Sequence, residues 1–198
     1  STLFVRKDTT AIVSALIGRY LTSAGDNSIV QGNPGVGKSR SIIEFGVREL
    51  LRLDDTKRPP AIVVFYEKKN GGYVVRKDKA TGEFVAEWFN GIDAVYLLLQ
   101  DPRVVYFHDC GKDQKVLDVP ATTILTVSIE AGMVEYFLNN KACSCLSFIM
   151  NPWIRGEVMA GCKVLGKDVD DVRKAFNRYG GIVRFVFGDP VAREWAEP

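Results

Sequence analysis

The sequence predicts an α/β fold: a three-layer sandwich with a mainly parallel sheet, helices on both faces and an inserted β-hairpin. Short apolar runs rich in β-branched and aromatic residues alternate along the chain with stretches of helical spacing, a pattern typical of βαβ units. The run over residues 61–66 is apolar throughout, as expected for a parallel strand that is buried on both faces. The length of 198 residues, 46% of them hydrophobic, suits one domain that buries its core without disulfides or metals.

The expected elements follow in order along the chain. Apolar residues at helical spacing predict a helix over residues 9–22, then a short strand over 28–31 and a second helix over 41–52. The later strands are expected at residues 61–66, 103–108, 123–129 and 146–150. The later helices are expected at residues 91–100, 131–139, 154–165 and 168–178, followed by an apolar segment at 182–187.

The inserted hairpin is expected at about residues 70–90. Two strand-like segments, 73–76 and 83–89, flank a turn that contains Asp78 and Gly82. No internal repeat or low-complexity segment interrupts the pattern. The chain begins and ends abruptly, so we interpret residues 1–198 as a single domain that is a fragment of a longer protein.

The charge balance excludes some classes of function. The chain has 26 basic and 24 acidic residues, a formal net charge of +2, so direct nucleic-acid binding is not supported by charge. No apolar run approaches the roughly 20 residues of a membrane-spanning helix, and no signal peptide is visible. We therefore expect no membrane partner.

Four cysteines are too sparse for a disulfide framework. Cys143 and Cys145 would share one face of a strand, and together with His108 and Cys110 they could form a zinc site. Structural zinc sites usually use wider pair spacings, so we expect reduced cysteines without metal.

Residues 32–39 fit the phosphate-binding pattern G-x-x-x-x-G-K-S, a P-loop, between an expected strand and an expected helix. The glycines let successive N–H groups turn inward around an anion. Lys38 would reach the β- and γ-phosphates, and Ser39 would bind Mg²⁺ through its hydroxyl. The pattern predicts a site for a nucleoside triphosphate with magnesium. The expected binding residues are Gly32, Asn33, Pro34, Gly35, Val36, Gly37, Lys38 and Ser39.

A second magnesium ligand is expected at the end of another apolar strand. Asp109 closes the run over residues 103–108 and is the best candidate, with capping of the following turn as the alternative. Asp101 begins a strand instead of ending one, which places it at the wrong edge.

The group that activates water is not fixed by the sequence. Many P-loop ATPases carry a glutamate directly after the magnesium aspartate, and here that position is Cys110, which cannot serve. Glu67, at the end of the strand over 61–66, is the candidate base, with a solvated charge beside Lys68 and Lys69 as the alternative. His108 is expected to pack beside its strand.

Two further polar residues are candidates for contact with the phosphates. Ser128 lies near the end of its strand and would sense the γ-phosphate, with Thr126 a poorer option. Arg184 would place a guanidinium on the phosphates, because its planar fork and permanent charge suit oxyanions. The alternative for both is a plain surface or capping role.

Five segments together resemble the P-loop NTPase module shared by Crinkler effectors of oomycetes and fungi and by trypanosomatid retrotransposon hot spot proteins. They are LFVR (3–6), GNPGVGKSR (32–40), the strand ending in Asp109, FIMNPW (148–153) and GGIVRFVF (180–187). Their order and approximate spacing match over nearly the whole chain. The last segment usually reads G-G-I-P-R-Y-V-F in the family, so Val183 departs from the family proline.

The resemblance extends to single residues. Arg184 matches the family arginine, Trp153 matches the family tryptophan after an M-P-P-like turn, and Asn151-Pro152 differs slightly from that turn. Arg40 matches the hot spot proteins and joins the expected nucleotide-binding residues.

The resemblance implies an ASCE-type ATPase core, with an attached or partner nuclease-like effector domain. By resemblance, the protein is a secreted effector that acts in the host cell nucleus or cytoplasm. ASCE modules often take an arginine from a neighbouring copy, which leaves a homo-oligomer open, with Arg155, Arg173 or Arg178 as the donor. No guanine-specifying N-K-x-D pattern is found, so ATP is preferred over GTP.

The sequence leaves several functions open. Lys38 and Ser39 favour an NTPase that hydrolyses the β–γ bond, whereas the lack of a glutamate after Asp109 favours a nucleotide-dependent switch with little turnover. A host-directed interaction module, in which the P-loop is mainly structural, is a third function compatible with the sequence, and a small-molecule kinase is a fourth.

Overall fold

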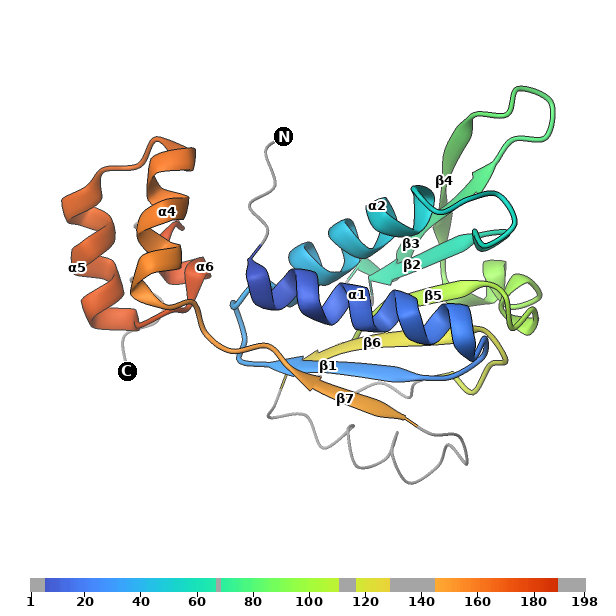
Figure 1. Ribbon diagram of the computed structural model, residues 1–198, viewed down its shortest axis with the longest axis horizontal. Coiled ribbons are helices and arrows are strands. Elements are labelled where there is room, and N and C mark those ends of the chain that lie inside the picture. The colour runs from blue at the N-terminus through green and yellow to red at the C-terminus, as the bar shows by residue number, and fades with distance from the viewer. Residues whose placement is uncertain (1–5, 67–68, 111–116, 129–144, 189–198) are drawn as a thin grey trace.

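The computed structural model describes residues 6–66, 69–110, 117–128 and 145–188 (Figure 1). The strands are β1 Ser28–Gly32, β2 Ile62–Tyr66, β3 Gly71–Lys77, β4 Phe84–Asn90, β5 Val105–Asp109, β6 Thr122–Ser128 and β7 Leu146–Ile149. The α-helices are α1 Lys7–Thr22, α2 Phe45–Leu51, α4 Arg155–Leu165, α5 Val169–Tyr179 and α6 Val183–Val186. A π-helical turn, η1 Ser39–Glu44, and two 3₁₀ turns, η3 Ile92–Val95 and η4 Leu98–Gln100, complete the described elements.

The described strands form one seven-stranded sheet in the order β4-β3-β2-β5-β6-β1-β7. From β2 to β7 every neighbouring pair is parallel, and the hairpin β3–β4 adds two antiparallel strands at one edge. The prediction of an α/β fold with a mainly parallel sheet and an inserted hairpin is therefore confirmed. The arrangement is compatible with a three-layer sandwich.

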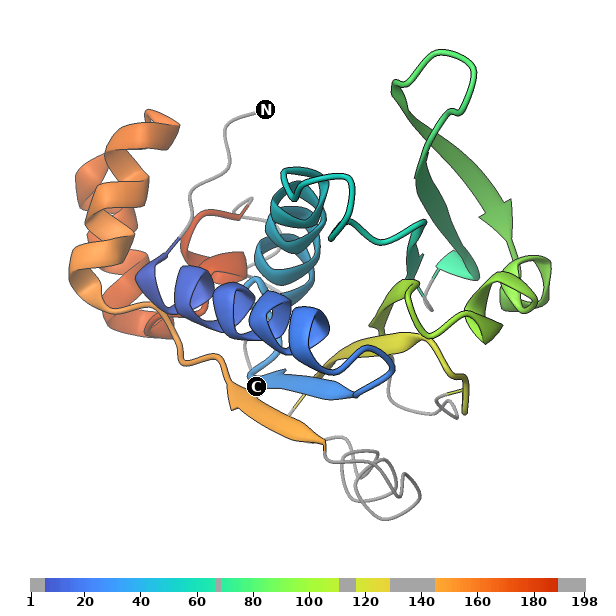
Figure 2. The same cartoon turned by 45° about the vertical axis from the view of Figure 1, so that its right-hand side comes forward.

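Helices α1 and α2 lie side by side over one face of the sheet (Figure 2). Apolar side chains from α1, the η1–α2 helix and the sheet form the larger core, which includes Leu16, Ile42 and Phe107. The opposite face packs against η3, η4 and the segment before β6, through residues such as Leu99 and Val119. Strands β2, β5 and β6 are buried on both faces, which explains why their sequences are mainly apolar. Strand β7 forms an edge of the sheet and is largely exposed.

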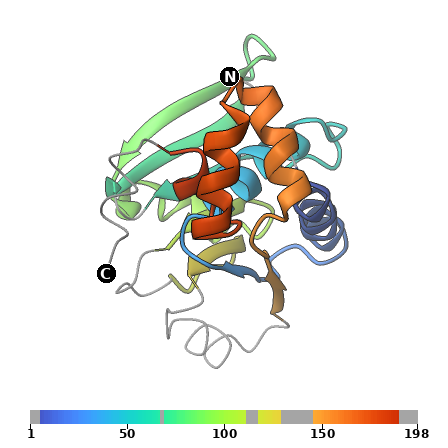
Figure 3. The ribbon, with the colours of Figure 1, turned by 90° about the vertical axis from the view of Figure 1, so that its left-hand side faces the viewer.

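Helices α4, α5 and α6 form a separate cluster at the carboxyl ends of the parallel strands (Figure 3). Their shared core contains Trp153, Val158, Cys162, Val172 and Val186. The side chain of Asp168 accepts hydrogen bonds from the backbone N–H groups of residues 170 and 171 and so begins α5. The Arg184 N–H and the Trp153 indole connect this cluster to the loop over residues 32–39, through hydrogen bonds to the carbonyls of Gly35 and Val36.

Several predicted elements differ in detail. The helix expected over residues 41–52 begins at Ser39 with a π-helical turn, and the helix expected over 91–100 is two 3₁₀ turns, a form used in short pieces. The apolar segment at 182–187 contains the short helix α6. The helix expected at 131–139 lies outside the described residues. Among the helices described, none has the length and apolar character that a membrane crossing requires.

Candidate functional site

The carboxyl ends of three parallel strands bring the predicted site residues to one edge of the sheet. In the register of β1 and β6, Gly32 lies opposite Ser128, and in that of β5 and β6, Asp109 lies opposite Thr126. The P-loop follows β1 directly at this edge. In parallel α/β sheets this is the edge at which ligands bind.

The backbone of the P-loop has the conformation that its glycines allow. Gly35 and Gly37 have φ angles of +82° and +93°, in the region that favours glycine. A Cβ atom at Gly32 would lie 2.6 Å from the carbonyl oxygen of Met150, and one at Gly35 would lie 2.9 Å from Cγ2 of Ile182. Larger residues at these two positions are therefore excluded by the segments that lie on either side of the loop.

The ammonium of Lys38 is directed back into the loop. Its Nζ donates hydrogen bonds to the carbonyl oxygens of Gly32 at 2.6 Å and Asn33 at 2.9 Å, and the residue is 9% exposed. Burial lowers the pKa of Lys38 from its ordinary value; the nearby Asp109 carboxylate counteracts this and the Arg184 guanidinium adds to it. A buried cation in a ring of backbone groups is a suitable receiver for an anion.

The two predicted magnesium ligands are in contact. The Ser39 hydroxyl donates to Oδ1 of Asp109 at 2.6 Å, and the Thr126 hydroxyl donates to the same oxygen at 3.0 Å. Hydroxyl and carboxylate oxygens suit Mg²⁺, which keeps several waters and binds few protein groups. In the described part of the chain, no group of three or more His, Cys, Asp or Glu side chains is arranged to hold a metal. The hydroxyl and carboxylate oxygens of Ser39 and Asp109 fit magnesium bound together with phosphates.

Ser128 and Arg184 both lie beside the P-loop. The Ser128 hydroxyl is buried and has no hydrogen-bond partner among the described residues, which costs about 1–3 kcal/mol unless another group satisfies it. The Arg184 backbone N–H donates to the Gly35 carbonyl at 3.2 Å. The Nε atom of the Arg184 side chain would lie 3.6 Å from a Cβ atom added at Gly35. Helix α6 thus brings a guanidinium to the loop.

Two other predicted residues, Arg40 and Cys110, contact other parts of the molecule. Glu67 and Cys143 lie outside the described residues. Arg40 lies on the surface of the helix after the P-loop, where its Nε is 3.7 Å from Glu44 and its side chain is 65% exposed. Cys110 packs against the small apolar cluster of Ile29, Leu125 and Val127.

Two residues that lie at the site in the structure had no predicted role there. Trp153 donates its indole N–H to the carbonyl oxygen of Val36, within the P-loop, at 3.1 Å. Tyr66 lies level with Asp109 in the pairing of β2 and β5, and burial raises the pKa of its hydroxyl. For Tyr66 a signal was present, because it ends an apolar strand as Asp109 does.

His108 packs in the sheet, as predicted, and does not reach the site as a base. Its ring is 5.6 Å from that of Tyr106 and 5.4 Å from that of Phe65. The residue is 2% exposed, and neither ring nitrogen has a hydrogen-bond partner among the described residues. Burial lowers the pKa of His108 to about 4, so the imidazole is neutral in the folded protein at pH 7.

This buried imidazole predicts a pH dependence of stability. Between pH 6.5 and about 4 the unfolded chain binds a proton at His108 and the folded chain does not, so stability falls as pH falls through this window. The loss from this residue is about 3 kcal/mol at most. Urea unfolding of the wild type and of His108→Leu at pH 7 and pH 4.5 measures this loss of stability. Equal pH dependence in the two proteins would contradict the assignment.

Compared with models of known protein families and with curated proteins, the chain matches none of them. The function is therefore inferred from the chemistry of the site itself. That site consists of a glycine-rich loop after a buried strand, an ammonium inside the loop, and a hydroxyl–carboxylate pair directly beside it.

Proposed function

We propose that this domain binds a nucleoside triphosphate with magnesium and hydrolyses its β–γ bond, as a P-loop NTPase of the Crinkler and hot spot protein type. The observation that carries the proposal is the 2.6 Å contact between Ser39 and Asp109, two residues that are 70 positions apart in the sequence. Their meeting beside Lys38 supports a shared magnesium and phosphate site. A chance match to the G-x-x-x-x-G-K-S pattern would not be expected to place a carboxylate from a distant strand beside the serine of the pattern.

Each residue has a defined task in this proposal. Lys38 and the inward backbone N–H groups of the loop hold the β- and γ-phosphates. Ser39 and Asp109 hold Mg²⁺, and Thr126 fixes the orientation of the Asp109 carboxylate through its hydrogen bond. Bound there, Mg²⁺ neutralises charge on the phosphate oxygens. The order of strands, in which β6 separates β1 from β5, supports the ASCE type of core.

Ser128 and Arg184 complete the phosphate environment. The unsatisfied Ser128 hydroxyl is suited to donate to a γ-phosphate oxygen, which would satisfy it. Arg184 supplies a second permanent positive charge beside the loop, where its backbone is bound to Gly35. Glu67 remains the proposed base that activates water.

A nucleotide-dependent switch with little turnover is the second candidate. The residue after Asp109 is Cys110, which packs against apolar side chains, so a carboxylate is missing from the position that many P-loop ATPases use. In this case the same residues hold the nucleotide, and its presence controls an attached or partner domain.

The wider setting rests on the resemblance alone. We propose ATP as the preferred nucleotide, with GTP as the alternative. As a Crinkler-like effector module, the domain would act in a host nucleus or cytoplasm together with a nuclease-like domain. A neighbouring copy in a homo-oligomer would supply a further arginine.

Phosphate release from the purified protein tests the proposal directly. We expect release from ATP, more slowly from GTP, and none after removal of magnesium with a chelator. Asp109→Asn keeps the shape of the side chain but removes its charge, and it should slow release about tenfold or more because it weakens charged contacts to the metal. Release that is unchanged in this variant would contradict the assigned site. Tight nucleotide binding without release would favour the switch.

A further inference from the structure

The segment between β7 and α4 contacts the P-loop through Trp153. The indole Nε1–H of Trp153 donates to the Val36 carbonyl at 3.1 Å in a buried setting, and the Trp153 backbone N–H donates to the Gly181 carbonyl at 2.9 Å. One residue therefore joins the loop, the start of α4 and the glycine turn before α6. Its ring also packs edge-on against Phe187, with 6.1 Å between centroids.

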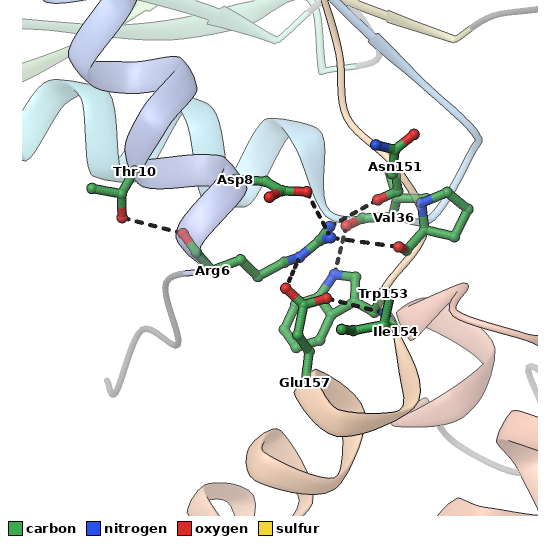
Figure 4. Close-up of polar contacts among 9 residues, drawn as sticks. Arg6, Asp8, Thr10, Val36, Asn151, Trp153, Ile154 and Glu157 are labelled. Carbon is green, nitrogen blue, oxygen red and sulfur yellow. Dashed lines mark hydrogen bonds and ion pairs between the residues drawn. The ribbon is translucent and has the colours of Figure 1, made fainter.

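A buried arginine holds Trp153 in place (Figure 4). Arg6, which is 3% exposed, lies over the Trp153 ring at 5.4 Å. Its guanidinium donates to Glu157 at 3.1 Å and to the carbonyls of Asn151 at 2.8 Å and Pro152 at 3.4 Å. A buried guanidinium is stable only when its N–H groups donate hydrogen bonds to well-placed acceptors. Apart from Asp8, to which the guanidinium donates at 3.4 Å, these partners belong to the Asn151–Glu157 segment that carries the tryptophan.

The contact with Val36 has a consequence for the phosphate site. In a planar trans peptide the carbonyl of one residue and the N–H of the next point in opposite directions. Because Trp153 draws the Val36 carbonyl outward, the N–H of Gly37 is turned to the other side, into the loop. The Arg184 backbone N–H donates to the Gly35 carbonyl in a similar way. This hydrogen bond fixes the orientation of the peptide between Gly35 and Val36. Two adjacent peptides of the loop are thus oriented from outside by the C-terminal helical cluster.

We propose that Trp153 is a positioning residue of the phosphate site, that Arg6 and Glu157 hold it there, and that it transmits the occupancy of the P-loop to α4–α6. This inference rests on the proposed function and adds a route of regulation to it. An anion that binds the Gly37 N–H pulls on the same peptide whose carbonyl meets the indole. The coupling is reciprocal, so whatever moves α4 or α6 also changes the affinity for nucleotide.

Fluorescence of Trp153 provides the first test. Replacing Trp88 and Trp195 by phenylalanine leaves Trp153 as the remaining tryptophan of the chain. Addition of magnesium ADP should shift the emission of Trp153 until the shift saturates. The midpoint of this titration should equal the midpoint that calorimetry gives for binding of magnesium ADP. The shift should be absent in Lys38→Met.

Variants provide the second test. Trp153→Phe, made in the otherwise unchanged protein, keeps a ring but loses the indole donor, and Arg6→Gln removes the charge that holds the ring. Each should weaken magnesium ADP binding about tenfold at a temperature where the protein is fully folded, which a purely structural role would not do. The control is Arg76→Gln, which removes an exposed ion pair with Glu87 on the hairpin and should leave affinity unchanged. If Arg6→Gln does not fold, Trp153→Phe decides.

The outcomes separate the two proposals. Calorimetric binding of magnesium ADP, together with unchanged Trp153 emission and unchanged affinity in Trp153→Phe, would overturn the coupling and leave the proposed function standing. Absence of any nucleotide binding in the wild type would overturn the proposed function, and the coupling with it.

Discussion

Lys38→Met is expected to weaken nucleotide binding about a hundredfold or more while the domain stays folded. The Lys38 ammonium is 9% exposed and lies within the loop that would surround the phosphates. Removing one member of a buried pair of opposite charges costs about 3–5 kcal/mol, which corresponds to the expected loss of affinity. Methionine keeps the length and the apolar stem of the side chain, so packing against the loop is largely retained.

Calorimetry with magnesium ATP and magnesium ADP measures this loss, and circular dichroism checks the fold. Lys57→Met is the matched control, because Lys57 is exposed in the loop after α2. It should bind as the wild type does. Binding in Lys38→Met at wild-type affinity would refute the assignment of residues 32–39 as a phosphate site.

Features that depend on local sequence could be predicted. The glycine-rich loop over residues 32–39 and the strand before it could be predicted, because glycine spacing, an apolar run and a following helix all occur within a short stretch of the chain. The meeting of Ser39 with Asp109 was also predictable over 70 positions, because parallel strands end at a common edge. The hairpin followed from alternating segments around Asp78 and Gly82.

Features that depend on register or on docking could not be predicted. Thr126 was the poorer candidate beside Ser128, yet its hydroxyl bonds to Asp109, because the register of β5 and β6 places the two residues opposite each other. The contact of Trp153 with Val36 spans 117 positions, and that of Arg6 with Glu157 spans 151. Both require the C-terminal helical cluster to pack against distant parts of the chain, and no local pattern specifies that.

The packing of those helices yields the second large effect, in Gly181→Ala. A Cβ atom at Gly181 would lie 1.9 Å from the carbonyl oxygen of Trp153 and 2.4 Å from its backbone nitrogen. Because both atoms are backbone, no side-chain rotation relieves the overlap, and the chain between β7 and α4 has to move. We expect a loss of about 3 kcal/mol in the free energy of unfolding, at the upper end for overpacking.

Gly156→Ala is the matched control for this substitution. Gly156 lies in α4, and a Cβ there would have no other atom within 4 Å. Alanine favours helices over glycine by up to about 1 kcal/mol, so this variant should be as stable as the wild type or more so. Urea unfolding of the three proteins compares them. Equal stability of Gly181→Ala and the wild type would mean that the glycine turn does not pack against Trp153. The proposed positioning of the P-loop by Trp153 would then lose the support of the Gly181 contact.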